Sequence, residues 1–219
     1  MNTKKILSVV LLFGFHCFGQ GFVNLNFESA TISNHAEIGS YAYTAIVSGW
    51  TYGQNYNYVN GNPDSIPYNN TALDAAAVNL EGTNNLFGPS AIQGKYSIFV
   101  QGGSQFAYTT NGASIMQTGQ IPATAQSIFY WGGALQVFFN GQTLAFNAIS
   151  NKPNYTVWAA DISAYAGQVG QLSFTALWQT SGLLDNIQFS STPVPEPSNL
   201  ALVALTLALF GFCQRKLVA

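Results

Sequence analysis

The sequence predicts an all-β sandwich, and three observations support this. Apolar and polar residues alternate in several short runs, as expected for strands with one face buried. Asn- and Gly-rich turn signals separate these runs, and no long amphipathic helical pattern lies between the two ends of the chain. Together these features predict about eight to ten short strands arranged in two packed sheets.

The expected strands follow one another along the chain. The first expected strand alternates clearly, with Val23, Leu25 and Phe27 on one face. In the strand expected at Gly170–Trp178, alternation directs Trp178 toward the core. The strands are expected at Phe22–Phe27, Ala75–Leu80, Tyr96–Val100, Ser127–Trp131, Leu135–Phe139, Gln142–Phe146, Tyr155–Ala159, Gly170–Trp178 and Leu183–Phe189.

The clearest local signal is a hairpin centred on Asn140 and Gly141. This dipeptide tolerates the positive φ that a type I′ turn requires at both central positions. A two-residue turn here also pairs apolar residues on one face, so turn and core agree. The pairs are Val137 with Leu144 and Leu135 with Phe146.

Two further segments have distinct signatures. The stretch 52–70 is dense in Asn, Gly, Tyr and Pro, and we expect a long loop of the kind that often binds ligands. Asp161 is expected to cap a short helical turn over Ile162–Ala166, which Gly167 ends.

The N-terminal segment predicts export. Lys4 and Lys5 precede an apolar run, Ile6–Phe15, that is shorter than the about 20 residues needed to cross a bilayer. We therefore expect a signal peptide over residues 1–19, cleaved by signal peptidase after Gly19. A lipoprotein reading of Cys17 is disfavoured, because His16 stands where a small residue is needed.

The remaining body, residues 20–192, is weakly charged and contains no cysteine. Seven acids and two bases give it a net charge near −5, so nucleic-acid binding is not expected. Without disulfides, the core alone must hold the exported domain together. The acids are Glu28, Glu37, Asp64, Asp74, Glu81, Asp161 and Asp185, and the bases are Lys95 and Lys152.

Asp185 is the acid with the strongest structural implication. Alternation places it on the same face as Leu183, Ile187 and Phe189, the expected core face. A buried carboxylate needs a partner, and the body has no arginine. Backbone N–H donors, or a Ca²⁺ ion shared with Glu28, would stabilise this carboxylate. The third possibility is that Asp185 lies at a solvated strand end and needs no partner.

Aromatic side chains are numerous, and Tyr52, Tyr56 and Tyr58 lie in the Asn-rich stretch. Sugars stack on exposed rings while amides contact their hydroxyls, so these three tyrosines are candidate ligand-binding residues. For Trp50 and Trp178 a place in the core is the simpler interpretation.

Catalytic signals are scarce, and we expect no enzyme. His35 is the only histidine of the body, no nucleophile elbow is present, and the ligands of a zinc site are missing. A two-carboxylate polysaccharide hydrolase or lyase is the less favoured alternative.

The C-terminal segment combines Val194-Pro195-Glu196-Pro197, an apolar run over Leu200–Cys213, and Arg215-Lys216. This combination resembles the PEP-CTERM sorting signal of exported bacterial proteins. The resemblance covers residues 193–219 and implies a membrane helix at about 199–213, recognition by an exosortase-type enzyme, and a surface rich in extracellular polysaccharide.

The body contains fragments that resemble the jelly-roll modules of the galactose-binding-like and carbohydrate-binding class. The resemblance implies a jelly-roll sandwich, and such modules often hold Ca²⁺ between an acid of the first strand and one of the last. The expected function is therefore adhesion or matrix association at the cell envelope or in the matrix, with carbohydrate binding as the alternative. The fragments are Asn24-Leu25-Asn26-Phe27-Glu28, Ser48-Gly49-Trp50, Gly94-Lys95-Tyr96-Ser97 and Leu184-Asp185-Asn186-Ile187.

Overall fold

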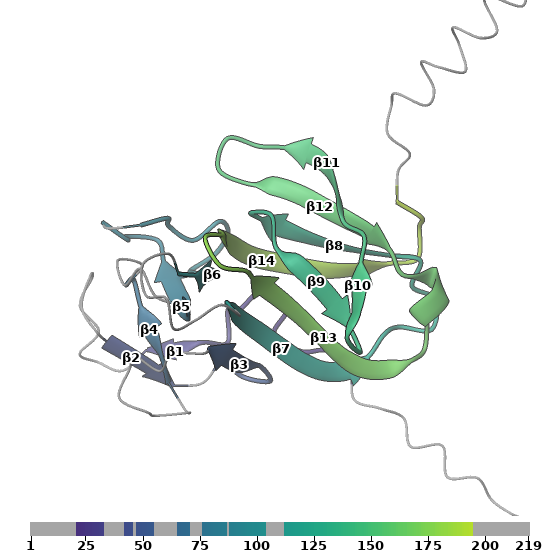
Figure 1. The fold of residues 1–219 in the computed structure, drawn as a ribbon, viewed down its shortest axis with the longest axis horizontal. Coiled ribbons are helices and arrows are strands. Elements are labelled where there is room, and N and C mark those ends of the chain that lie inside the picture. Colours follow the sequence, from purple (N-terminus) through teal and green to yellow (C-terminus); the bar gives the residue numbers. More distant parts are fainter. Residues whose placement is uncertain are drawn as a thin grey trace, which may run out of the picture.

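The structure is a computed structural model, and it describes residues 21–32, 42–45, 47–54, 65–70, 76–86, 88–103 and 112–194. In these ranges the chain is nearly all β and forms two sheets in a sandwich-like arrangement (Figure 1). The predicted signal peptide and the helix at about 199–213 lie outside these ranges. Within them, no helix has the length and apolar character needed to cross a bilayer.

The larger sheet has nine strands, in the order β1-β2-β4-β5-β6-β14-β8-β12-β11. Neighbouring strands are antiparallel except β4 and β5, which are parallel. The strands are β1 (Thr31–Ile32), β2 (Ala42–Ala45), β4 (Ser65–Tyr68), β5 (Ala76–Gly82), β6 (Tyr96–Gly102), β14 (Ser181–Ser190), β8 (Ser127–Gly132), β12 (Thr156–Asp161) and β11 (Asn147–Asn151).

The smaller sheet has five strands, in the order β10-β9-β13-β7-β3, all antiparallel. Its register aligns one inward residue from every strand in a single row, and a second, outward row runs beside it. The strands are β10 (Gln142–Leu144), β9 (Gln136–Phe139), β13 (Val169–Ala176), β7 (Ala113–Gln120) and β3 (Thr51–Gln54). The inward row is Leu144, Val137, Phe174, Ile115 and Tyr52.

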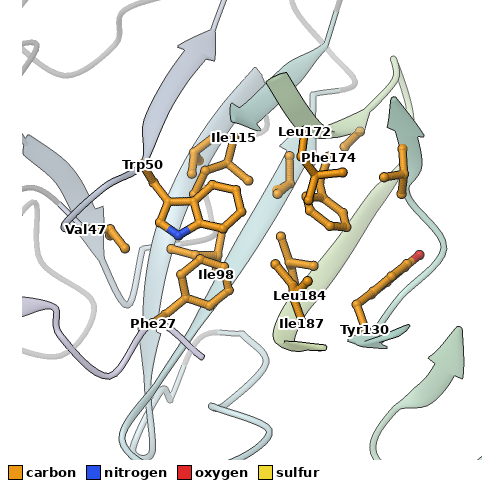
Figure 2. Packing of buried hydrophobic residues seen from close by; sticks show 14 of the residues in the cluster. Phe27, Val47, Trp50, Ile98, Ile115, Tyr130, Leu172, Phe174, Leu184 and Ile187 are labelled. Atoms are coloured by element: carbon orange, nitrogen blue, oxygen red, sulfur yellow. The ribbon is translucent and has the colours of Figure 1, made fainter. Parts of the chain in front are cut away.

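Aromatic rings join the two sheets through the core. Phe174 of β13 contacts Trp50 and Tyr130, with ring centroids 6.3 Å and 5.5 Å apart. Figure 2 shows Trp50 and Phe27 at one end of the cluster and Tyr130 at the other, with Leu184 on the Tyr130 side. Because Tyr130 and Leu184 come from the larger sheet, Phe174 packs directly against the opposite layer.

The locally coded elements are confirmed. The hairpin pairs Leu144 with Val137, and Asn140 and Gly141 have φ values of 49° and 77°, as a type I′ turn requires. The ladder ends at this pair, so the expected pair of Leu135 with Phe146 does not form part of it. The expected strands from Ala75 to Leu80 and from Tyr96 to Val100, and those beginning at Ser127, Tyr155, Gly170 and Leu183, correspond to β5, β6, β8, β12, β13 and β14.

The helical turn is a short 3-10 helix, η1 (Ser163–Tyr165), and Gly167 follows it with φ +75°. The residue at its cap position is Ile162, not Asp161. Asp161 ends β12, and its Oδ1 accepts the Ser163 N–H at 2.8 Å. This bond to the backbone lowers the pKa of Asp161 below 3.8.

The prediction of a strand over Phe22–Phe27 is wrong. Asn24 and Phe27 have φ values of 49° and 59°, which no strand contains, and the Phe27 N–H bonds back to the Asn24 carbonyl. The segment is a looped entry to the domain, attached by a bridge from Gly21 to Gln120 and by the Gln117 amide, which bonds both backbone groups of Val23. Phe27 is fully buried, as expected, while Val23 is 38% exposed.

Two other expectations need correction. The segment 52–70 is not one long loop, because it contains most of β3 and all of β4; residues 55–64 lie outside the described ranges. Trp178 does not point inward. The strand β13 ends at Ala176, the Thr180 N–H bonds to the Leu177 carbonyl in a turn, and Trp178 is 49% exposed.

Replacing the ring that joins the two sheets tests this core. We expect Phe174→Ala to lower the free energy of unfolding by about 3–5 kcal/mol, because a fully buried ring leaves a cavity. Phe138→Ala, in the adjacent strand β9 but on the outer face of the same sheet, should cost clearly less. Urea denaturation measures both; equal losses would contradict the assignment of the two faces.

Candidate functional site

Asp185 is the centre of a polar site on the outer face of the larger sheet. This residue is 1% exposed, and its carboxylate accepts three hydrogen bonds. The Ser97 hydroxyl and the Gln93 N–H donate to Oδ2 at 2.8 and 3.1 Å, and the Asn186 N–H donates to Oδ1 at 2.6 Å. Burial raises the pKa of Asp185 to about 6, although these three bonds oppose the increase.

The position of Asp185 corrects the expected face. Leu184 pairs with Ile98 and both belong to the buried core, so the neighbouring Asp185 and Leu183 point away from it. The ladder between β14 and β8 shifts register between Asp185 and Gln188, and Asn186 has φ +46°. This irregularity returns Ile187 to the core, so Asp185 and Ile187 lie on opposite faces.

The segment between β5 and β6 covers this face, and we call its described residues 83–86 and 88–95 the strap. Glu28, from the entry loop, holds the end of the strap: its Oε1 accepts the N–H groups of Lys95 and Tyr96 at 2.8 and 3.1 Å. Gly94, with φ +64°, makes the turn, and a side chain there would collide with the Glu28 carboxylate. Glu28 contributes to the raised pKa of Asp185, after burial, so the two acids interact.

Glu81 is a functional candidate that sequence reasoning did not single out. It pairs with Ser97 across β5 and β6, and its side chain is fully buried beneath the strap. The Asn85 amide of the strap donates to Glu81 Oε2 at 2.5 Å, and burial raises the pKa of Glu81 to about 8. Because Val78 and Leu80 point into the core, alternation along β5 places Glu81 on the outer face of the sheet. No sequence pattern predicts that the strap covers this face and buries Glu81.

Backbone and hydroxyl donors satisfy Asp185, which supports the first of the alternatives considered for it. Among the described residues no group of three or more His, Cys, Asp or Glu side chains comes together around a potential metal. Ca²⁺ also uses carbonyl oxygens, and both bonds described for Glu28 use Oε1, so Glu28 Oε2 and Asp185 Oδ1 are the oxygens available to such an ion.

The other candidate residues fall into two groups. Tyr52, on β3, lies in the inward row and packs against the core, half-buried. Tyr56, Tyr58 and His35 lie outside the described ranges, as do Pro195, Glu196, Pro197, Arg215 and Lys216 of the sorting motif; Val194 is the last described residue. Carbohydrate binding and the absence of catalysis therefore stay predictions.

Removing the Ser97 hydroxyl tests the Asp185 site. We expect Ser97→Ala to lower the free energy of unfolding at pH 8 by about 1–3 kcal/mol, because Asp185 loses a donor and the Ile92 N–H loses its acceptor. The loss should shrink near pH 5, since the Ser97 bond stabilises ionised Asp185 and its removal raises that pKa further.

Ser114→Ala is the matched control, because its hydroxyl bonds only the neutral Thr175 hydroxyl among the described contacts. Its effect should be small and independent of pH. Denaturation curves at both pH values measure the two variants, and a Ser97→Ala loss that is the same at pH 5 and pH 8 would exclude a role through the Asp185 charge.

Comparison with known proteins assigns no family. No family model matches the chain, and no curated protein matches it. Among solved structures, the K2 cleaved adhesin domain of Lys-gingipain has 14% sequence identity and a TM-score of 0.38, over 79% of this chain and 97% of that domain. The function proposed below therefore rests on the sequence and geometry of this chain.

Proposed function

We propose that this chain is an exported cell-surface or extracellular-matrix protein whose β-sandwich body, a jelly-roll module, serves adhesion or matrix association without catalysis. The observation that carries the proposal is the order of segments in the sequence. A basic and apolar leader precedes the β body, and Val194-Pro195-Glu196-Pro197, an apolar run and Arg215-Lys216 follow it.

The end of the β body fits this division. The Gln126 N–H bonds to the Ser190 carbonyl at 2.8 Å, and the Ser127 hydroxyl bonds to the Thr192 carbonyl at 2.6 Å. The body is thus fastened at Thr192, just before the sorting motif begins. An exosortase-type enzyme acting near Pro195–Pro197 would leave these two bonds in place.

The composition of the smaller sheet suits contact with a neutral matrix. Its five strands contain no charged residue. Its outward row offers hydroxyl, thioether and aromatic groups, which suit contact with uncharged, hydroxyl-rich polymers. The row is Thr51, Met116, Ser173, Phe138 and Thr143.

Processing of the tail tests the proposal. In a bacterial host with an exosortase-type enzyme, intact mass of the surface-recovered protein should show loss of residues 1–19 and of the tail. Replacing Glu196 and Pro197 by Ala should leave the tail uncleaved and the protein in the membrane fraction. Pro153→Ala, an exposed proline of the body, is the control. Identical masses for wild type and the double variant would contradict the sorting role.

We further propose that Glu28 and Asp185 share a structural Ca²⁺ ion. Two interacting acids with no basic partner among the described residues suit a hard cation, and carbonyl oxygens of the chain would have to complete its shell. Ca²⁺ should then raise the melting temperature of the chelator-treated protein, because an ion bound to the native state stabilises it. Glu28→Gln should abolish the rise and Asp161→Asn should keep it. A melting temperature indifferent to both Ca²⁺ and chelator would refute the site.

A further inference from the structure

The unpartnered polar atoms of the described part of the molecule gather in one place. Five fully enclosed side-chain atoms have no hydrogen-bond partner, and all belong to residues within β5 or directly after β4. Such atoms are few in native proteins, and a cluster of them has a physical reason. They are Asn69 Nδ2, Asn70 Nδ2, both side-chain atoms Oδ1 and Nδ2 of Asn79, and Glu81 Oε1.

The chemistry of these atoms is mixed, which excludes an ion as the answer. Three are amide nitrogens that donate, and two are oxygens. A cation would meet the N–H groups unfavourably, and an anion would meet the Glu81 carboxylate. A proton on Glu81 suits the cluster better, because it removes the buried charge and adds a donor.

The sequence offers few bases that could neutralise Glu81. Between residues 21 and 192 the chain has only Lys95, Lys152 and His35; Lys95, in the strap, is exposed. The other titratable groups on the described elements around Glu81 are acids: Tyr68 on β4, Tyr96 on β6, Asp185 on β14 beyond Ser97, and Glu28 of the entry loop, which accepts the Tyr96 N–H. Burial and nearby Tyr96 raise the pKa of Tyr68 above 10.0, with a smaller contribution from Glu81.

The side chains of three acidic residues accept most of the hydrogen bonds that hold the strap. The Glu81 side chain accepts a hydrogen bond from the Asn85 amide. Asp185 accepts one from the Gln93 N–H, and Glu28 accepts one from the Lys95 N–H. Two further bonds join the Ala91 N–H to the Gly82 carbonyl and the Ile92 N–H to the Ser97 hydroxyl.

The described residues of the strap bury little apolar surface. Leu86 is 78% exposed, and Ala91 and Ile92 are only half-buried. A segment with few buried apolar contacts opens at low free-energy cost.

We propose that the strap is a pH-sensitive cover: it stays closed over the outer face while Glu81 is protonated, and it is released when Glu81 ionises. Opening exposes the carboxyl to water, where its pKa returns toward the ordinary 4.5. The closed state therefore binds one more proton than the open state between that pH and about pH 8. Rising pH in this window favours opening, and the effect levels off above it.

Between pH 6 and pH 8 the ionisation of Glu81 governs how strongly strap opening depends on pH. A change of one proton makes the opening constant rise at most tenfold per pH unit. Because Glu81 is half ionised in the closed state at pH 8, the rise across this window is about 50-fold.

Hydrogen exchange on the full chain measures the opening constant. After correction for intrinsic exchange, the Ala91 and Ile92 amides should open about 50-fold more often at pH 8 than at pH 6, with little change above pH 8.5. Glu81→Gln should give a flat profile, and Asp161→Asn, an exposed acid of β12, should keep the wild-type slope. A flat wild-type profile, or the same slope in Glu81→Gln, overturns the proposal.

Trypsin supplies a second readout that needs no variant. Within residues 21–192 it has two lysines to attack, and Lys152 is protected because Pro153 follows it. Cleavage after Lys95 therefore reports release of the strap. Relative to a reference peptide at each pH, its rate should rise between pH 6 and pH 8 and then level off. A constant relative rate contradicts the proposal even if Glu81→Gln fails to fold.

Discussion

The burial of Asp185 without a basic partner is the constraint on which this end of the domain depends. Three donors from three elements converge on its carboxylate: Ser97 from β6, Gln93 from the strap and Asn186 from β14 itself. The irregular backbone at Asn186 makes this possible, since it turns Asp185 outward while Leu184 and Ile187 stay in the core. The Ile187 N–H then bonds to the Leu25 carbonyl, which fixes the entry loop beside the same site.

Sequence reasoning succeeded where the fold is coded locally. The Asn140-Gly141 turn and the alternation of β13 each specify their own register, and the inward positions Leu172, Phe174 and Ala176 follow. It failed where the backbone leaves regular geometry. Left-handed residues at Asn24 and Phe27 turn an alternating run into a loop, and strict period-two reasoning placed Asp185 on the wrong face.

The candidate site was predicted only in part, because burial by a distant segment leaves no periodic signal. That Asp185 is buried followed from its apolar neighbours. That Glu81 is buried did not, because alternation with Val78 and Leu80 assigns it to an outer face. Among the described segments, the strap covers that face, held by the Asn85 amide and by hydrogen bonds to Asp185 and Ser97.

The two buried acids also differ in what their surroundings do to charge. Asp185 has three donors, so hydrogen bonding offsets much of the desolvation penalty and its pKa reaches only about 6. Glu81 accepts one hydrogen bond, at Oε2, and Oε1 accepts none; the pKa of Glu81 reaches about 8. At neutral pH the first is therefore mostly ionised and the second mostly protonated. These two acids lie on one sheet face with Ser97 of β6 between them, and they have different roles. The charge of Asp185 holds three elements together, while Glu81 permits the strap to close because it can become neutral.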